Sequence, residues 1–214
     1  MAKQKLPNID EKVIRSFSIP DIRAVEDENG VIEGHPAVYD QTTNIGGYFY
    51  EVIERGAFDE CNFDDVLFTA NHNVWDIPLA RSRRNNSNST LQISLDDKGL
   101  LIKANMDIDN NAEAKSLYSA VKRQDIEGMS FIFYIKECRW ENLDTDMPTR
   151  RITKMKKVRE VSAVNFPAYE GTDIQARNDQ AALDNALRAL DNARSKELDN
   201  STLELERTRF NTLY

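Results

Sequence analysis

The sequence is poor in cysteine and histidine and has no long hydrophobic run. Its 214 residues include two cysteines, Cys61 and Cys138, and two histidines, His35 and His72. Two cysteines do not make the disulfide framework of a small secreted protein, and they suit a reducing cytosol. Two histidines and the absence of a CxxC pair exclude a histidine-rich metal site and argue against structural zinc. We therefore expect no metal and no cofactor.

No apolar stretch approaches the roughly 18–20 residues that a membrane span needs. The first residues carry lysines but no continuous apolar segment after them, so we also expect no secretory signal. Lys and Arg number 28 against 36 Asp and Glu, a net charge of −8. This charge argues against nucleic acid or an anionic membrane as a partner, although a local basic patch would escape the argument. The sequence also lacks the P-loop, GxGxxG, HExxH and GxSxG motifs.

Strand-like segments dominate up to about residue 170. Runs rich in β-branched and aromatic residues predict strands at 13–19, 22–25, 31–39, 48–53, 66–71, 91–95, 100–106, 131–138, 152–155 and 158–166. Gly34 and Pro36 predict a bulge or an edge position for the third strand, because proline has no N–H to donate. The residues DDKG between 95 and 100 predict a hairpin.

Two helical regions are predicted. The first follows Asn110 or Asn111, either of which can cap it, and its buried stripe is Ala114, Leu117, Tyr118 and Val121. After about residue 175 a second stripe appears, formed by Leu183, Ala186, Leu187, Leu190 and Ala193. Ser201 and Glu204 have the spacing of a capping box, so this region predicts one or two amphipathic helices. We expect one domain at 1–175 and a helical C-terminal tail at 176–214.

Three polar residues are candidates for chemistry. His72 follows a predicted strand and precedes a loop, a position that suits a general base. Ser130 is a small hydroxyl residue in a bulky strand, and Gly128 before it allows close approach of a substrate carbonyl. Glu160 is a single acid in an apolar strand and needs a partner or water. Taken one at a time, each residue fits a structural role better than a catalytic one.

Other residues compete for these roles. His35 is a minor alternative for the base. Cys61 and Cys138 are alternative nucleophiles, but Cys61 follows an acidic stretch and Cys138 lies among charged residues. Neighbouring carboxylates raise the pKa of a thiol and oppose formation of the thiolate.

Four segments, taken together and in order, resemble one family. They are GHPAVYD with FYEVIERGAFDE, then LFTANHN, then EGMSFIFYI after the predicted helix, and finally VREVSAVNFPAYEGT. Over roughly residues 30–175 the chain is similar to the prohead proteases of tailed bacteriophages, which are capsid-maturation serine proteases. The combination is specific, whereas no single segment is.

The resemblance assigns roles to the candidates. It makes His72 the base, Ser130 the nucleophile and Glu160 the third member of a triad, with Asp125, Glu127 and His35 to be tested next for the third role. Backbone N–H groups near Ser130 are expected to stabilise the oxyanion. No arginine pair follows Glu160, so an arginine-assisted oxyanion site is not implied.

The resemblance also implies a fold and a function. The family resembles the herpesvirus assemblins, so we expect an α+β, mostly β fold, built as an antiparallel β-barrel with surrounding helices. The third catalytic residue of assemblins is a histidine, from which this chain departs. The implied activity is that of a serine endopeptidase, which cleaves segments of the scaffold and major capsid protein, and itself, inside the assembling prohead in the host cytoplasm.

Self-association is expected, and the tail would serve as an assembly or packaging handle or as a removable segment. Two alternatives remain open: a non-catalytic capsid assembly factor with a protease-like fold, and a cysteine-dependent hydrolase.

Overall fold

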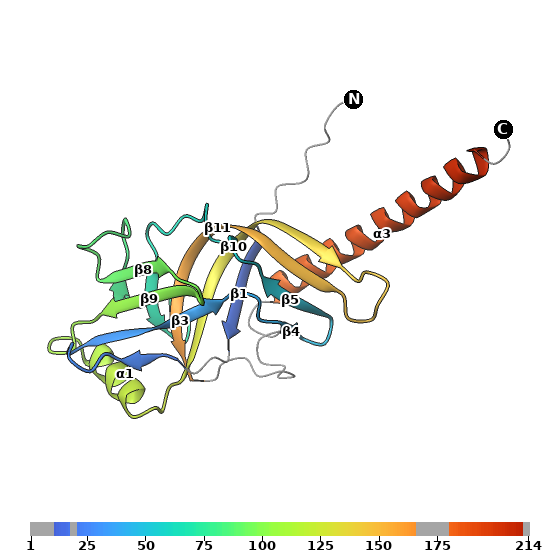
Figure 1. The fold of residues 1–214 in the computed structure, drawn as a ribbon. Coiled ribbons are helices and arrows are strands. Elements are labelled where there is room, and N and C mark those ends of the chain that lie inside the picture. The colour runs from blue at the N-terminus through green and yellow to red at the C-terminus, as the bar shows by residue number, and fades with distance from the viewer. Residues whose placement is uncertain (1–10, 18–20, 166–179, 212–214) are drawn as a thin grey trace.

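The computed structural model describes residues 11–17, 21–165 and 180–211, with side chains for 21–165 and 183–198. Within these ranges the strands form one sheet of seven strands and one of four (Figure 1). The elements are β1 (Glu11–Phe17), β2 (Arg23–Ala24), β3 (Val31–Val38), β4 (Thr43–Ile45), β5 (Phe49–Ile53), β6 (Leu67–Ala70), β7 (Ala80–Arg81), β8 (Leu91–Leu95), β9 (Gly99–Asn105), α1 (Ala112–Lys122), β10 (Gly128–Glu141), β11 (Thr149–Val164) and α3 (Gln180–Asn211).

Strand β11 connects most of the larger sheet because it has partners along both edges. Along one edge it pairs antiparallel with β10, which in turn pairs antiparallel with β1. Along the other edge, residues 149–152 pair parallel with β5 and residues 160–163 pair parallel with β6. Strands β4 and β7 extend the sheet beyond β5 and β6. The end of β6 is thereby brought beside the end of β11.

The smaller sheet has the antiparallel order β2-β3-β9-β8. The ladder between β3 and β9 shifts register between Gly34 and Ala37, so the predicted bulge around Pro36 is confirmed. Gly34 lies where the two sheets approach each other. A Cβ atom there would come within 2.9 Å of Ile22 Cα and of Met129 Sδ, which explains why the position requires glycine.

The prediction of one closed antiparallel barrel is wrong for the described part of the chain. A closed barrel needs every strand to be paired along both edges. Strand β2 has only two residues and lies beside α1, and β8 forms its described ladder with β9 alone. The parallel pairing of β5 and β6 with β11 also departs from an all-antiparallel arrangement. The α+β, mostly β class is confirmed.

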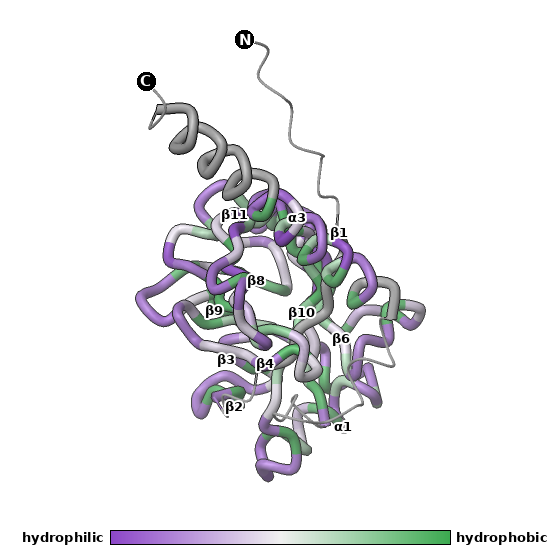
Figure 2. The backbone as a smooth tube through the Cα atoms, turned by 90° about the vertical axis from the view of Figure 1, so that its right-hand side faces the viewer, coloured by the Kyte–Doolittle hydropathy of each residue, from purple (hydrophilic) through white to green (hydrophobic). Residues whose placement is uncertain are grey.

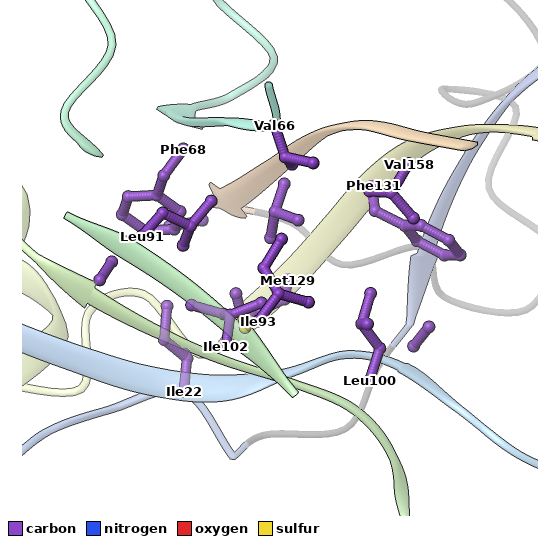
Figure 3. Packing of buried hydrophobic residues seen from close by; sticks show 14 of the residues in the cluster. Ile22, Val66, Phe68, Leu91, Ile93, Leu100, Ile102, Met129, Phe131 and Val158 are labelled. Carbon is purple, nitrogen blue, oxygen red and sulfur yellow. The ribbon is translucent and has the colours of Figure 1, made fainter. Parts of the chain in front are cut away.

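The hydrophobic core lies between the two sheets. Phe131 and Met129 of β10 face Ile102 and Leu100 of β9, and all four side chains are buried (Figure 3). Figure 2 shows the hydrophobic stretches running along the strands and the hydrophilic ones in the outer loops. Alternate residues of β10 enter this core, so Ser130 points to the other face of the sheet.

Most predicted elements are confirmed with small shifts of their ends. Asn111 caps α1 and accepts from the N–H groups of Glu113 and Ala114, while Ala114, Leu117 and Val121 are buried. The last two predicted strands form the single strand β11, and the short strands β4 and β7 were not predicted. Residues 18–19 and 166 of the predicted strands lie outside the described residues.

Helix α3 begins against the larger sheet and extends away from it (Figure 1). Its Leu183 and Ala186 are buried in a small cluster with Ile45 and Phe49, and Trp140 packs against this cluster. The predicted helical tail is thus a single helix, which continues through Ser201. The predicted domain boundary at 175/176 lies outside the described residues.

The sheet beneath α3 contains a buried ion pair. Arg150 Nε donates to Glu51 Oε2 at 2.8 Å, and both side chains are buried. The guanidinium carbon lies 5.1 Å from the ring centre of Phe49 and 5.8 Å from that of Trp140. These same two rings pack in the cluster that α3 completes. Removing α3 would therefore expose both rings to water and hydrate the ion pair.

Further along α3, Arg194 donates from Nε to the carbonyl of Leu143 at 3.1 Å and from Nη2 to that of Thr145 at 2.9 Å. These contacts attach the helix to the turn between β10 and β11. None of the described helices is long and apolar enough to span a membrane.

Two truncations separate the docked part of α3 from its extension. Ending the chain after Arg177 should leave the β-rich part folded but lower its free energy of unfolding by roughly 3–6 kcal/mol, because the burial of Leu183 and Leu190 is lost. Ending it after Glu197 should leave this free energy unchanged. Urea unfolding followed by circular dichroism measures both. If the chain that ends after Arg177 were unfolded, α3 would have to be counted as part of the folding core.

Candidate active site

Three neighbouring strands place polar side chains in one row. Ser130 of β10 lies opposite Ser162 of β11, and Ser162 lies beside Thr69 of β6. Residues that are paired across a sheet share a face, as do alternate residues along a strand. Glu160, two positions before Ser162, is therefore on this face as well, while Phe131 lies on the core face. The alternation that builds the core also gathers three hydroxyls and a carboxylate on the opposite side.

His72 reaches this row because the chain turns sharply at the end of β6. Asn71 and His72 have φ values of 49° and 60°, in the left-handed region that Asn and His adopt more readily than most residues. The N–H of Asn71 donates to the carbonyl of Ala163 at 2.9 Å, and its side-chain oxygen accepts from the N–H of Asn165 at 3.1 Å. The turn is thus fastened to the end of β11.

His72 lies between Ser130 and Glu160. Its Nε2 is 2.6 Å from Ser130 Oγ, and its Nδ1 is 2.8 Å from Glu160 Oε2. Because a carboxylate can only accept, Nδ1 carries the proton and donates it to Glu160. Nε2 is then left to accept from the Ser130 hydroxyl. This tautomer allows the histidine to take the proton of the serine.

Thr69 and Ser162 hold the other side of the site. Thr69 Oγ1 donates to Glu160 Oε1 at 2.5 Å, so it must accept from Ser162 Oγ, 2.8 Å away. Ser162 Oγ in turn accepts from the backbone N–H of His72 at 2.8 Å. The Glu160 carboxylate can only accept, and this sets the direction of each hydrogen bond in the series from Glu160 through Thr69 and Ser162 to the N–H of His72. Ser162 therefore positions the backbone of His72 while Thr69 positions Glu160.

The site is mostly shielded from water. Ser130 and Glu160 have no exposed surface, whereas 22% of the His72 side chain is exposed. A buried carboxylate is costly unless it is compensated. Here Oε1 accepts from Thr69 and Oε2 from His72, so both oxygens are bound. In this low-dielectric setting the hydrogen bonds are electrostatically stronger than they would be in water.

The competing histidine lies elsewhere. His35 Nδ1 is 2.5 Å from Asp21 Oδ2, and its Nε2 is 2.9 Å from Asp96 Oδ2. Burial opposes ionisation of Asp21, but hydrogen bonds from Lys98 and His35 outweigh it and lower the pKa of that carboxyl. Asp125, another alternative, is bound by Arg123. The structure brings neither His35 nor Asp125 into the row with Ser130.

Cys61 offers little as a nucleophile. Burial raises the pKa of the Cys61 thiol to about 12, while nearby Lys157 acts in the opposite direction. The predicted direction of the shift is confirmed, but its main cause is burial and not the acidic stretch. Among the described residues, no group of three His, Cys, Asp or Glu side chains could hold a metal ion.

The family model of the caudovirus prohead serine protease matches residues 19–186. The chain belongs to this family. The match includes β6, the turn with His72, and strands β10 and β11, and therefore the whole row of polar residues. A comparison with curated proteins and with solved structures gave no match. The resemblance inferred from the sequence segments is confirmed.

Sequence reasoning missed Thr69 and Ser162. Ser162 stands two residues after Glu160, so strand alternation alone places the two on one face. The role of Thr69 depends on the parallel register between β6 and β11, which the sequence does not display. The expected oxyanion donors near Ser130 remain a prediction. Strand β10 is flanked there by β1 and β11, so its amides lie in the plane of the sheet.

Replacing Ser162 by alanine tests its positioning role. The buried N–H of His72 would lose its acceptor, which should lower stability by about 1–3 kcal/mol and slow phosphonylation of Ser130 by a fluorophosphonate roughly tenfold. Ser162→Thr, which keeps the hydroxyl, should restore most of the rate.

Ser82→Ala is the matched control. Ser82 Oγ is also buried and accepts a backbone N–H, that of Val66, at 3.0 Å. Val66 directly precedes β6, so Ser82 lies at the opposite end of this strand from His72. Loss of its hydroxyl should therefore reduce stability without slowing the reaction of Ser130. If Ser130 were labelled at equal rates in wild type and Ser162→Ala, the proposed role of Ser162 in positioning His72 would be rejected.

Proposed function

We propose that the protein is a prohead maturation protease, a serine endopeptidase whose nucleophile is Ser130. The observation that carries the proposal is the hydrogen-bonded series of Ser130, His72 and Glu160, found in a chain of the prohead serine protease family. The members come from three different strands or strand ends, and the spacing between them suits direct proton transfer.

The geometry suggests a sequence of steps. Ser130 Oγ attacks a peptide carbonyl while its proton passes to His72 Nε2, and the bond to the leaving amine breaks as that amine takes the proton from Nε2. This leaves an acyl group on Ser130. A water molecule then attacks the acyl carbonyl, again giving its proton to His72, and Ser130 regains a proton as the acid product leaves.

Glu160 would act through His72. It holds Nδ1 protonated, which keeps Nε2 free to accept, and its charge stabilises the imidazolium that forms in each step. Thr69 fixes the second oxygen of Glu160, so the carboxylate cannot turn away from the ring. The role of Thr69 is to preserve this orientation.

The family supports capsid proteins as substrates inside the assembling shell. We propose that the cleaved segments belong to the scaffold and the major capsid protein, and that the enzyme also cleaves itself. The action would take place in the host cytoplasm, within the prohead. Self-association of the enzyme and a role of α3 as an assembly handle belong to the same proposal.

The two alternatives have less support. A non-catalytic assembly factor would not need a complete nucleophile, base and acid in hydrogen-bond contact. A cysteine hydrolase would need a thiolate, which the raised pKa of Cys61 opposes.

Loss of the nucleophile or the base should abolish processing. Ser130→Ala and His72→Ala should each reduce kcat by ~10⁶-fold, as in other serine proteases with such triads. The assay is co-expression with the cognate major capsid protein, followed by mass spectrometry of the fragments. The double variant Cys61→Ser/Cys138→Ser is the control and should process like wild type.

The same experiment separates the alternatives. Near wild-type processing by Ser130→Ala would reject the nucleophile assignment. Loss of processing in a folded cysteine double variant would support the thiol mechanism. An unprocessed capsid protein with wild-type enzyme, together with no phosphonylation of Ser130, would favour the assembly factor.

Replacing Glu160 by glutamine should reduce activity less than loss of Ser130. The amide keeps a hydrogen bond to His72 but loses the charge and can favour the wrong tautomer, a change that costs up to about 10⁴-fold in kcat. The comparison uses kcat for wild type, Glu160→Gln and Ser130→Ala on one capsid substrate. Full activity of Glu160→Gln would place the third role on another residue.

A further inference from the structure

The loop between β6 and β7 exposes two large apolar side chains beside the candidate active site. Trp75 is 92% exposed and Ile77 is 80% exposed, the highest values among the large hydrophobic residues that the structure describes. They stand on either side of Asp76, three and five positions after His72. Single exposed apolar residues are common on protein surfaces. Tryptophan, however, is enriched among the residues that carry most of the energy of protein binding, so an exposed tryptophan close to a second exposed apolar residue is a candidate contact surface.

Hydrogen bonds fix the course of this loop. The N–H of Asn73 donates to the carbonyl of Ala70 at 3.0 Å, and that of Val74 donates to the carbonyl of His72 at 2.9 Å. Asn73 Nδ2 also donates to Asp76 Oδ2. These contacts cross the first half of the loop, so the backbone that carries Trp75 is tied to the backbone of His72.

The end of the loop is anchored as well. The N–H of Leu79 donates to the carbonyl of Phe68 at 2.9 Å, and the Leu79 side chain is buried in the core. The loop therefore starts at the end of β6 and finishes at β7, which pairs with β6. Trp75 and Ile77 are presented by a loop with both ends fixed, which reduces the conformational entropy that binding would cost.

The position of the pair indicates what it contacts. Three residues span at most about 11 Å, so Trp75 cannot lie farther than this from His72 along the chain. An extended peptide advances about 3.3 Å per residue. A substrate whose scissile carbonyl lies at Ser130 would thus bring side chains within about four residues of that bond to the loop. The active site itself makes a peptide the occupant that this surface fits best.

We propose that Trp75 and Ile77 form an apolar subsite for the substrate. The subsite would take a large aliphatic or aromatic side chain located within about four residues of the cleaved bond. The inference rests on the proposed function and adds a specificity determinant to it. Tryptophan suits this role because its large, rigid surface gains contact area while few rotatable bonds are fixed.

The test compares Trp75→Ala with Trp75→Phe and with Tyr48→Ala. Tyr48 is also an exposed aromatic residue, but it precedes β5, which pairs with the opposite end of β11 from Glu160. Trp75→Ala should lower kcat/KM for the major capsid protein by about 10–30-fold, mainly through KM. Trp75→Phe should retain most of the value, and Tyr48→Ala should match wild type.

A double-mutant cycle then locates the contact. Each large apolar residue within four positions of the cleaved bond is replaced by serine in the capsid protein. At the residue that fills the subsite, this change should slow cleavage by wild type but have little further effect with Trp75→Ala. Additive effects at every position would overturn the proposal.

The outcomes distinguish this inference from the proposed function. If wild type is not phosphonylated at Ser130 and does not cleave, the proposed function fails. If wild type cleaves and Trp75→Ala cleaves equally well, only the subsite is rejected. If Trp75→Ala instead changes the oligomeric state in light scattering and leaves KM unchanged, the surface contacts a second copy and the subsite is likewise rejected.

Discussion

The register between β10, β11 and β6 is the constraint on which the rest of the site depends. It aligns Ser130, Ser162 and Thr69 across three strands, and it places Glu160 two positions away on the same face. A slip of one residue in any of these strands would reverse its faces, so that Phe68, for example, would leave the core and Thr69 would enter it. The burial of the aromatic core therefore holds the polar row in place. The chemistry depends on the core although the two occupy opposite faces.

The turn at Asn71 and His72 is the locally strained part of this arrangement. Left-handed backbone in a residue other than glycine costs on the order of 1 kcal/mol or more, and two such residues stand in succession. The cost is offset by three hydrogen bonds: the Ala163 carbonyl and Ser162 Oγ accept from the N–H groups of the turn, and the N–H of Asn165 donates to Asn71 Oδ1. All three partners belong to the end of β11 or follow it. The strand that supplies Glu160 thus also stabilises the backbone that presents His72.

Much of this could be predicted from local patterns. The β-branched and aromatic run at 131–138 predicted most of β10, and the capping asparagine with the apolar stripe after it predicted α1. The three candidate residues could be selected only together, because each fits a structural role when considered alone. The parallel pairing of β5 and β6 with β11 was not predictable, since it joins residues 99 and 93 positions apart by backbone contacts that leave no motif. The same pairing departs from the predicted all-antiparallel arrangement and explains why Thr69 was missed.

The hydrogen-bonded partners of the site lie far apart in the sequence, so they are synthesised at different times. His72 and Glu160 are 88 residues apart, and Thr69 and Ser162 are 93 apart. At ribosomal rates of about 5–20 residues per second, His72 is synthesised roughly 4–18 s before Glu160. Throughout that interval the nascent chain has a histidine without Glu160, and its turn lacks the strand end that fastens it. The hydrogen-bonded row of Ser130, His72 and Glu160 therefore cannot form in the growing polypeptide until β11 has emerged and paired.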